Sequence, residues 1–217
     1  MRVRWVTFDC YGTLIDWERG ITDALLPLLP SGVDRDAVAR RYIEIEAAIE
    51  GGSYLAYRDV LDRAGRALLR EHGIDAPSPL PASLPLWRPF PEVPGALRAL
   101  REGGYRIAIL SNVDRDLLDA SIRRLDVAPD LAVTAQDCGS YKPAPGHWLY
   151  FQRASGAGPA ETVHVGASQF HDIRPAATLG YRTVFIDRHG EPLTTTPTRV
   201  LPDLALLPSA IDKLAGT

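Results

Sequence analysis

The second half of the chain alternates short apolar runs with amphipathic segments. Runs rich in β-branched and aromatic residues predict buried strands at residues 105–110, 131–134, 162–166 and 182–186. Helical spacing of apolar positions predicts helices at residues 96–102, 115–125, 145–155, 173–179 and 209–214. Strands that alternate with helices in this way are typical of a parallel sheet with helices on both faces.

A further apolar run begins at Arg4 and ends at Asp9, and it predicts the first buried strand. An unpaired carboxylate is costly to bury, so Asp9 is expected at the edge of the sheet with polar partners. Gly12 permits a sharp turn after it, which brings the Thr13 hydroxyl back toward Asp9. Ligands bind outside the carboxyl ends of strands in open α/β sheets, so Asp9 lies where chemistry is expected. The alternative is an aspartate that only begins a turn.

Helical patterns fill the region between this strand and the next. Helices are expected at residues 16–29, after an N-cap at Asp34, and at residues 54–71. Seven prolines then lie within residues 77–94, which predicts a stiff connector without regular structure. We therefore expect an α/β protein with a Rossmann-like, doubly wound parallel sheet at residues 1–15 and 91–217. Residues 16–90 are expected to form an inserted helical cap with a Pro-rich return connector.

Composition and charge exclude several classes of function. The net charge of -3 over 217 residues comes without a basic run, which argues against nucleic acid as a partner. No apolar run has the length of a transmembrane helix, and no signal peptide precedes the first strand, so no membrane partner is expected. Cys10 and Cys138 form neither a metal-type nor a disulfide-type pattern. A reducing, cytoplasmic setting fits these features.

The predicted strand ends carry a set of polar side chains that can converge at one edge of the sheet. They are Asp9, Thr13, Ser111, Asn112, Lys142, Ser168, Gln169 and Asp172. Asp9 can attack an electrophilic carbon or phosphorus, while Lys142 lowers its pKa and Asp172 holds Lys142, a water or a metal. Ser111 and Asn112, with nearby backbone N–H groups, can bind an anionic group.

Structural roles remain open for several of these residues. Ser111 and Asn112 can begin a turn, and Asp172 can cap the helix that follows it. Lys142 can be a solvated loop residue, but lysine occurs only here and at position 213 in a chain rich in arginine. A lysine in such a chain indicates a need for a compact ammonium, which arginine cannot imitate.

Four segments together resemble the haloacid dehalogenase superfamily. They are residues 9–13 (Asp-Cys-Tyr-Gly-Thr), 110–112 (Leu-Ser-Asn), 141–143 (Tyr-Lys-Pro), and Val165-Gly166 followed by His171-Asp172. Their order and spacing match over essentially the whole chain, and the sequence is most similar to the type II 2-haloacid dehalogenases. The resemblance implies a helical cap after the first strand, an aspartyl-ester mechanism, and a homodimer through the cap helices.

The resemblance also suggests a role for each candidate residue. Asp9 is expected to be the nucleophile, Lys142 its electrostatic partner, and Asp172 the residue that orients Lys142 or the water. Substrate contacts are expected from Cys10 (through its backbone N–H), Tyr11, Thr13, Ser111, Asn112 and Gln169. Dehalogenases of this group receive the halide on a cap arginine, for which Arg40 and Arg41 are the candidates, Arg41 being preferred. A small anionic substrate is the expected partner.

Two departures from the phosphatases of the superfamily favour a dehalogenase. Phosphatases have an acidic residue two positions after the nucleophile, where this chain has Tyr11, a poor general acid. Ala167 stands where a metal-binding carboxylate is often found, so no metal or other cofactor is expected. The alternative is a Mg²⁺-dependent phosphatase, with the metal on Asp9 and Asp172. A third alternative is a weakly active scaffold that binds anions, for which Tyr11, Ala167 and Trp148 are the best support.

Overall fold

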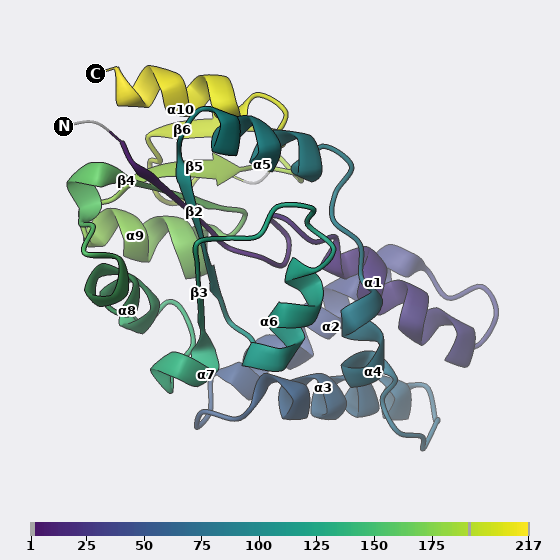
Figure 1. Cartoon of the computed structure of the whole chain (residues 1–217). Helices are drawn as coiled ribbons and strands as arrows, with labels where there is room; N and C mark the ends of the chain where they lie inside the picture. Colours follow the sequence, from purple (N-terminus) through teal and green to yellow (C-terminus); the bar gives the residue numbers. More distant parts are fainter. Residues whose placement is uncertain (1–2, 191, 217) are drawn as a thin grey trace.

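The computed structural model describes residues 3–190 and 192–216, and its centre is a six-stranded, fully parallel sheet (Figure 1). The strands are β1 (Trp5–Phe8), β2 (Arg106–Ser111), β3 (Leu131–Thr134), β4 (Thr162–Gly166), β5 (Arg182–Ile186) and β6 (Arg199–Leu201). Their order is β3-β2-β1-β4-β5-β6, so the direction of winding reverses at β1. The predicted doubly wound α/β fold is therefore confirmed.

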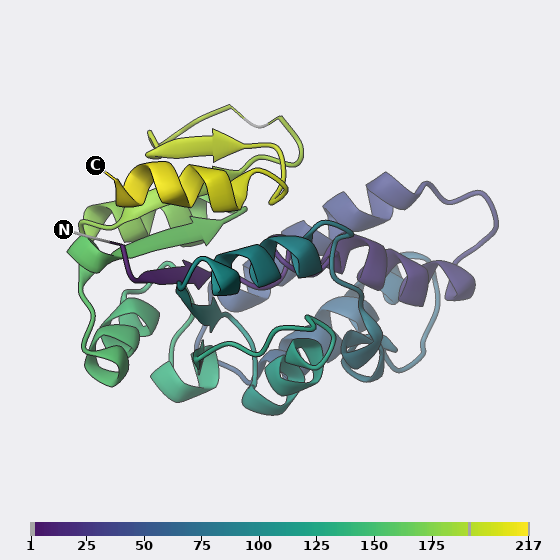
Figure 2. The ribbon, with the colours of Figure 1, turned by 45° about the horizontal axis from the view of Figure 1, so that its top comes forward.

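Helices cover both faces of the sheet (Figures 1 and 2). On one face lie α5 (Val93–Glu102), α6 (Arg115–Ile122) and α10 (Leu207–Ala215). On the other lie α8 (Gly146–Ser155) and α9 (Arg174–Thr178). Successive residues of β1 serve opposite cores, since Val6 and Phe8 pack in one cluster and Trp5 packs with Trp148 and Phe151 in the other.

The helical insert lies between β1 and α5 and stands beside the sheet in Figure 1. It consists of α1 (Trp17–Leu25), a 3₁₀ turn (Leu26–Leu28), α2 (Arg35–Glu50), α3 (Tyr57–Glu71), α4 (Leu80–Ser83) and a second 3₁₀ turn (Leu84–Leu86). The predicted cap at Asp34 is confirmed, because its carboxylate accepts a hydrogen bond from the Ala37 N–H at 2.8 Å. The exact boundaries of the insert, at residues 16 and 90, remain a prediction.

The structure corrects the prediction that residues 77–94 lack regular elements. They contain α4, the second 3₁₀ turn, and the first two residues of α5. Pro81, Pro85 and Pro94 occupy first-turn positions of these elements. A helix has no internal acceptor for the N–H groups of its first turn, so proline costs little there. The prolines therefore begin short helices rather than prevent them.

Four further short elements were not predicted, one of them a 3₁₀ turn (Pro159–Glu161). The capping box of Thr134 and Asp137 begins α7 (Ala135–Cys138). A π-helical turn (Gln169–Ile173) precedes α9, with Ser168 as its N-cap. The edge strand β6 follows a polar, proline-containing segment, and its side chains are mostly exposed, so it lacks the apolar pattern of the inner strands.

Hydrogen bonds from the core fix the position of the cap. The Asp114 carboxylate, just after β2, accepts from the N–H groups of Tyr57 at 2.9 Å and Arg58 at 3.0 Å. The first turn of α3 is thus capped by a residue of the core instead of by its own N-cap, Ala56. The Tyr141 hydroxyl adds a bond to the Leu55 carbonyl at 2.8 Å.

Among the described residues, no helix combines the length and apolar character needed to span a bilayer.

Candidate active site

One buried ammonium joins two carboxylates at the carboxyl edge of the sheet. Lys142 Nζ lies 2.8 Å from Asp9 Oδ1 and 2.6 Å from Asp172 Oδ1. Asp172 is 0% exposed, Lys142 2% and Asp9 9%. Lys142 is thus no solvated loop residue, and of the three side chains Asp9 keeps the largest exposed fraction. The sequence-based expectation that these strand ends converge holds for all three side chains.

The turn after β1 holds Asp9 in place. Its N–H continues the sheet by donating to the Val165 carbonyl at 2.9 Å. Thr13 Oγ1 donates to Asp9 Oδ2 at 2.9 Å and accepts from the Ala167 N–H, also at 2.9 Å. Gly12 has φ of +93°, which makes the reversal possible without the strain a side chain would add. Thr13 therefore fixes the carboxylate and ties it to the end of β4.

Asp172 is held by groups from β4 and the turn that follows it. Its Oδ2 accepts from the Ser168 N–H at 3.3 Å, and His164 Nε2 lies 3.6 Å from its Oδ1. A Cβ on Gly166 would lie 2.5 Å from the Cβ of Asp172, so only glycine lets this side chain approach the strand. The alternative of a helix N-cap at Asp172 is wrong, because Ser168 caps the turn and Asp172 faces Lys142.

Asn112 is bonded to the main chain of Lys142, whereas the side chain of Ser111 is unpaired within the described part of the chain. Asn112 Oδ1 accepts from the Lys142 N–H at 2.6 Å, and its Nδ2 donates to the Lys142 carbonyl at 3.1 Å. Asn112 therefore positions the lysine through its main chain. Ser111 is fully buried, and its Oγ has no hydrogen-bond partner among the described residues. Buried hydroxyls are normally bonded, so this one is available to a ligand.

Burial and charge set the protonation of the three groups. Burial raises the pKa of Asp9 to about 6, against the lowering effect of Lys142. Burial also acts to raise the pKa of Asp172, but Lys142 outweighs it and holds that pKa well below its usual range. Burial lowers the pKa of Lys142, and the two carboxylates more than offset this, so the ammonium stays charged. Of the two carboxylates bonded to Lys142, Asp9 is therefore the one that changes its protonation state close to neutral pH.

A cavity of about 290 Å³ opens onto Asp9 from the side of the cap. The core contributes Asp9, Tyr11, Ser111, Asn112, Lys142, Ala167, His171, Asp172 and Arg188, among others. The cap contributes Trp17, Glu18, Ile43, Glu46, Glu50 and Tyr57. The cavity is small, lies over Asp9, and has polar groups on both sides, as expected of a site for a small polar molecule.

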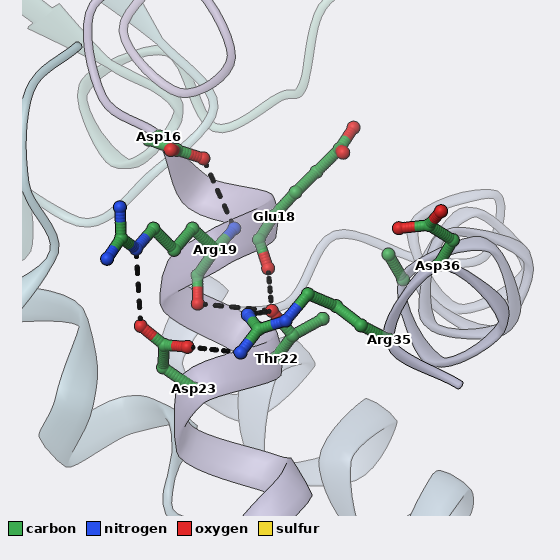
Figure 3. Close-up of a pocket in the computed structure, with 8 residues that line it drawn as sticks. Asp16, Glu18, Arg19, Thr22, Asp23, Arg35 and Asp36 are labelled. Carbon is green, nitrogen blue, oxygen red and sulfur yellow. Dashed lines mark hydrogen bonds and ion pairs between the residues drawn. The ribbon is translucent and has the colours of Figure 1, made fainter. Parts of the chain in front are cut away.

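A larger hollow of about 440 Å³ lies elsewhere, between α1 and the start of α2 (Figure 3). Three of its charged side chains pair with each other. Arg35 bonds to Thr22 and to Asp23, the latter at 2.7 Å, and Arg19 lies 3.5 Å from Asp23. None of the candidate site residues lines it. The side chains that line this hollow therefore hold α1 and α2 of the cap together.

The structure does not bring every candidate to the cavity. Arg41 is exposed and bonds to Glu71 and Glu44 at 2.6 Å each, so the expectation that it contacts substrate is corrected. Arg40 is exposed and lies 4.0 Å from Asp34. Gln169 bonds to the loop at residues 192–195. Cys10 is buried beneath the site and does not line the cavity.

Four charged residues at the cavity were not predicted. Glu18 reaches it from α1, Glu46 and Glu50 reach it from α2, and Arg188 reaches it from the segment after β5. Arg188 donates to the carbonyls of Gly12 at 3.1 Å and Thr13 at 2.9 Å, and it pairs with Glu92 at 2.8 Å. It therefore braces the turn that carries Asp9. The sequence does contain a signal for the two glutamates of α2: residues 42, 46 and 50 are four apart, so on a helix they share the face that carries the buried Tyr42.

The carboxylates present do not fit a magnesium site. Mg²⁺ prefers several oxygen ligands in octahedral geometry. Asp9 and Asp172 each give an oxygen to Lys142, and Ala167 has no donor to add. In the described part of the chain, no group of three or more His, Cys, Asp or Glu side chains is arranged to hold a metal ion. Lys142 supplies positive charge to both carboxylates here.

Comparison with known proteins places the chain among hydrolases. Residues 3–180 match the haloacid dehalogenase-like hydrolase family. The chain is 27% identical to haloacetate dehalogenase H-2 of Moraxella sp. (strain B), over 93% of this chain and 94% of that protein. It is also 27% identical to a phosphoglycolate phosphatase of Aquifex aeolicus (strain VF5), over 83% of each.

The fold has a close counterpart of known structure. The L-2-haloacid dehalogenase of Xanthobacter autotrophicus superposes with a TM-score of 0.86, covering 98% of this chain and 100% of that one, at 20% identity. That likeness concerns the fold, including the insert after β1. Together with the family match over residues 3–180, it shows that the chain belongs to the haloacid dehalogenase-like hydrolases.

Proposed function

We propose that the protein hydrolyses the carbon–halogen bond of a small 2-haloacid and releases the 2-hydroxy acid and halide. The observation that carries this proposal is the Asp9 carboxylate, held by Lys142 and Thr13 beneath a small cavity. An oriented carboxylate at such a site is suited to attack an electrophilic carbon. Relatives named haloacetate dehalogenase and (S)-2-haloacid dehalogenase support the choice of substrate class.

In the first step, an oxygen of Asp9 attacks C2 of the 2-haloacid. The new C2–O bond forms as the C2–halogen bond breaks, and the halogen leaves with the bonding pair as halide. Lys142 and Thr13 hold the carboxylate in one orientation, which reduces the entropic cost of the attack. The product is an ester between Asp9 and the acid.

In the second step, water attacks Cγ of Asp9 and the ester bond breaks. The 2-hydroxy acid leaves with the oxygen that Asp9 donated, and Asp9 gains the oxygen of water. One proton of that water goes to the departing oxygen and the other to solvent. Lys142, held by Asp172 beside Asp9, stabilises negative charge that develops there.

A phosphatase is the second candidate, because a phosphatase relative matches most of the chain. Its usual acid would sit at position 11, where the Tyr11 hydroxyl is 2.9 Å from Ser121 Oγ. Burial raises the pKa of Tyr11 well above its ordinary value, so it is a poor proton donor to a leaving group. The geometry thus favours the dehalogenase.

The deciding experiment measures halide release from (S)-2-chloropropionate and chloroacetate beside phosphate release from an aryl phosphate. Each reaction is run with Mg²⁺ and with a chelator. We expect halide release that the chelator leaves unchanged, since Lys142 provides the charge at Asp9. Phosphate release that requires Mg²⁺, without halide release, would overturn the proposal in favour of the phosphatase.

The pH dependence of turnover follows from the environment of Asp9. Because burial raises its pKa to about 6, protonation removes the nucleophile at a higher pH than for an ordinary aspartate. We expect kcat/KM for halide release to rise as pH increases through about 6 and then to level off. Initial rates from pH about 4.5 to 8 measure this. A profile that stays flat down to the lowest pH would contradict the assignment of Asp9.

A further inference from the structure

Two glutamates of the cap, Glu46 and Glu50, line the cavity opposite Asp9. They lie four residues apart on α2, so their side chains share one face of the helix. Tyr42 and Tyr57 donate to Glu46 Oε1 at 3.2 Å and 2.8 Å, which fixes that carboxylate in place. In the part of the chain that the structure describes, the Glu50 side chain has no hydrogen-bond partner of its own.

No cation of the protein neutralises this pair. Within the described residues, neither glutamate forms an ion pair with a lysine, arginine or histidine. Lys142 bonds to Asp9 and Asp172, Arg188 pairs with Glu92, and His189 pairs with Glu18. Burial raises the pKa of Glu46 to about 7, against the hydrogen bonds from the two tyrosines, and raises that of Glu50 to about 8, where Glu46 adds to the shift and Lys142 only partly opposes it.

A second feature of the same cavity indicates a polar ligand. Ser111 lines it from the core and is fully buried, yet its Oγ has no partner among the described residues. The cavity therefore has an unused hydroxyl on the core side, near Asp9, and unneutralised carboxylates on the cap side. A ligand that satisfies both sides must carry a polar group at each end.

We infer that Glu46 and Glu50 select a substrate that carries a primary ammonium group at the end remote from its reacting carbon. The inference rests on the proposed function and narrows it to 2-haloacids with a positively charged side chain. The ammonium group can donate three hydrogen bonds, and it supplies the paired positive charge that no described residue of the protein provides to the two glutamates. A 2-haloacid with an apolar side chain leaves both carboxylates buried against hydrocarbon, which costs binding energy.

The test compares two substrates of nearly equal shape, 4-amino-2-chlorobutanoate and 2-chloropentanoate, which differ by an ammonium in place of a methyl group. We expect the wild-type kcat/KM to favour the amino compound by at least about tenfold, the size of one hydrogen bond to a charged group. In Glu50→Gln and Glu46→Gln this ratio should fall toward one. Glu44→Gln, on the same helix but paired with Arg41 outside the cavity, should keep it.

The outcomes separate this inference from the proposed function. A wild-type ratio near or below one, or equal ratios in Glu50→Gln and Glu44→Gln, would overturn the inference while halide release stands. If no substrate releases halide, calorimetry compares binding of 4-amino-2-hydroxybutanoate with 2-hydroxypentanoate to the wild type. Tighter binding of the amino compound that is lost in Glu50→Gln would support recognition of the ammonium group although the proposed reaction fails. Equal affinities of the wild type for the two compounds would overturn the inference. Glu50→Gln decides the matter if Glu46→Gln fails to fold, because Glu50 bonds to no tyrosine.

Discussion

Replacing Asp9 with asparagine should abolish halide release, with a loss in kcat on the order of 10⁴ or more, as expected for loss of a covalent nucleophile. An amide has no negative charge and is a poor nucleophile at carbon. The side chain keeps nearly the same volume, so the cavity and its other polar groups are retained. Binding of the 2-hydroxy acid product should therefore survive, which separates loss of chemistry from loss of the site.

An isotope experiment makes the role of Asp9 directly visible. In the proposed mechanism the oxygen of water enters Asp9 first, and a later turnover transfers it to product. Wild-type protein that turns over in H₂¹⁸O should therefore gain mass in the peptide that contains Asp9. Asp36→Asn, an exposed aspartate on the cap, is the matched control and should keep both turnover and label. Halide release by Asp9→Asn at a rate close to wild type would exclude Asp9 as the nucleophile.

The convergence of the candidate site residues could be predicted because it depends on topology. In a parallel sheet all strands end at the same edge, so polar residues that follow separate strands must come together there. Asp9 follows β1, Asp172 follows β4, and Lys142 lies in the connection between β3 and β4. Their contacts at 2.8 Å and 2.6 Å are the consequence. Sequence separation of more than a hundred residues does not matter for such groups.

The cap side of the site was predictable only in part. The helical spacing gave the buried face of α2, including Tyr42 and Ile45, but the choice of Arg41 required a register that the apolar pattern does not set. Arg41 lies next to that face and bonds to Glu71 of α3. Glu46 follows Tyr42 by one turn and shares its face, so an acidic residue in an otherwise apolar stripe was the available signal.

The junction between cap and core left no local signal. Asp114 caps α3 from a position 57 residues away from Tyr57, and nothing in the sequence near Ala56 indicates this. Such a bond depends on how two separate units pack. Propensity and periodicity describe neighbours along the chain, so they predict the helix without its cap. The edge strand β6 was not predicted for a related reason: its side chains are mostly exposed, so its sequence needs no apolar pattern.

Replacing Lys142 with methionine should lower the free energy of unfolding by about 3–5 kcal/mol, because it removes one partner from a buried network of charges. Methionine fills similar space, so the loss comes from electrostatics. Asp9 and Asp172 would then face each other without a cation, and the pKa of Asp9, already raised to about 6, would rise further. Halide release should be lost at neutral pH for the same reason.

Urea unfolding at neutral pH measures the stability of this variant, with Lys213→Met as the matched control on an exposed site of α10. Lys142→Arg should not restore activity, because the guanidinium is too large and planar for a site that is 2% exposed. The decisive comparison is Lys142→Met combined with Asp172→Asn. Removing one carboxylate relieves the repulsion, so the double variant should regain part of the lost stability but no halide release. A single variant that unfolds like wild type would show that Lys142 is not the counterion on which both carboxylates depend.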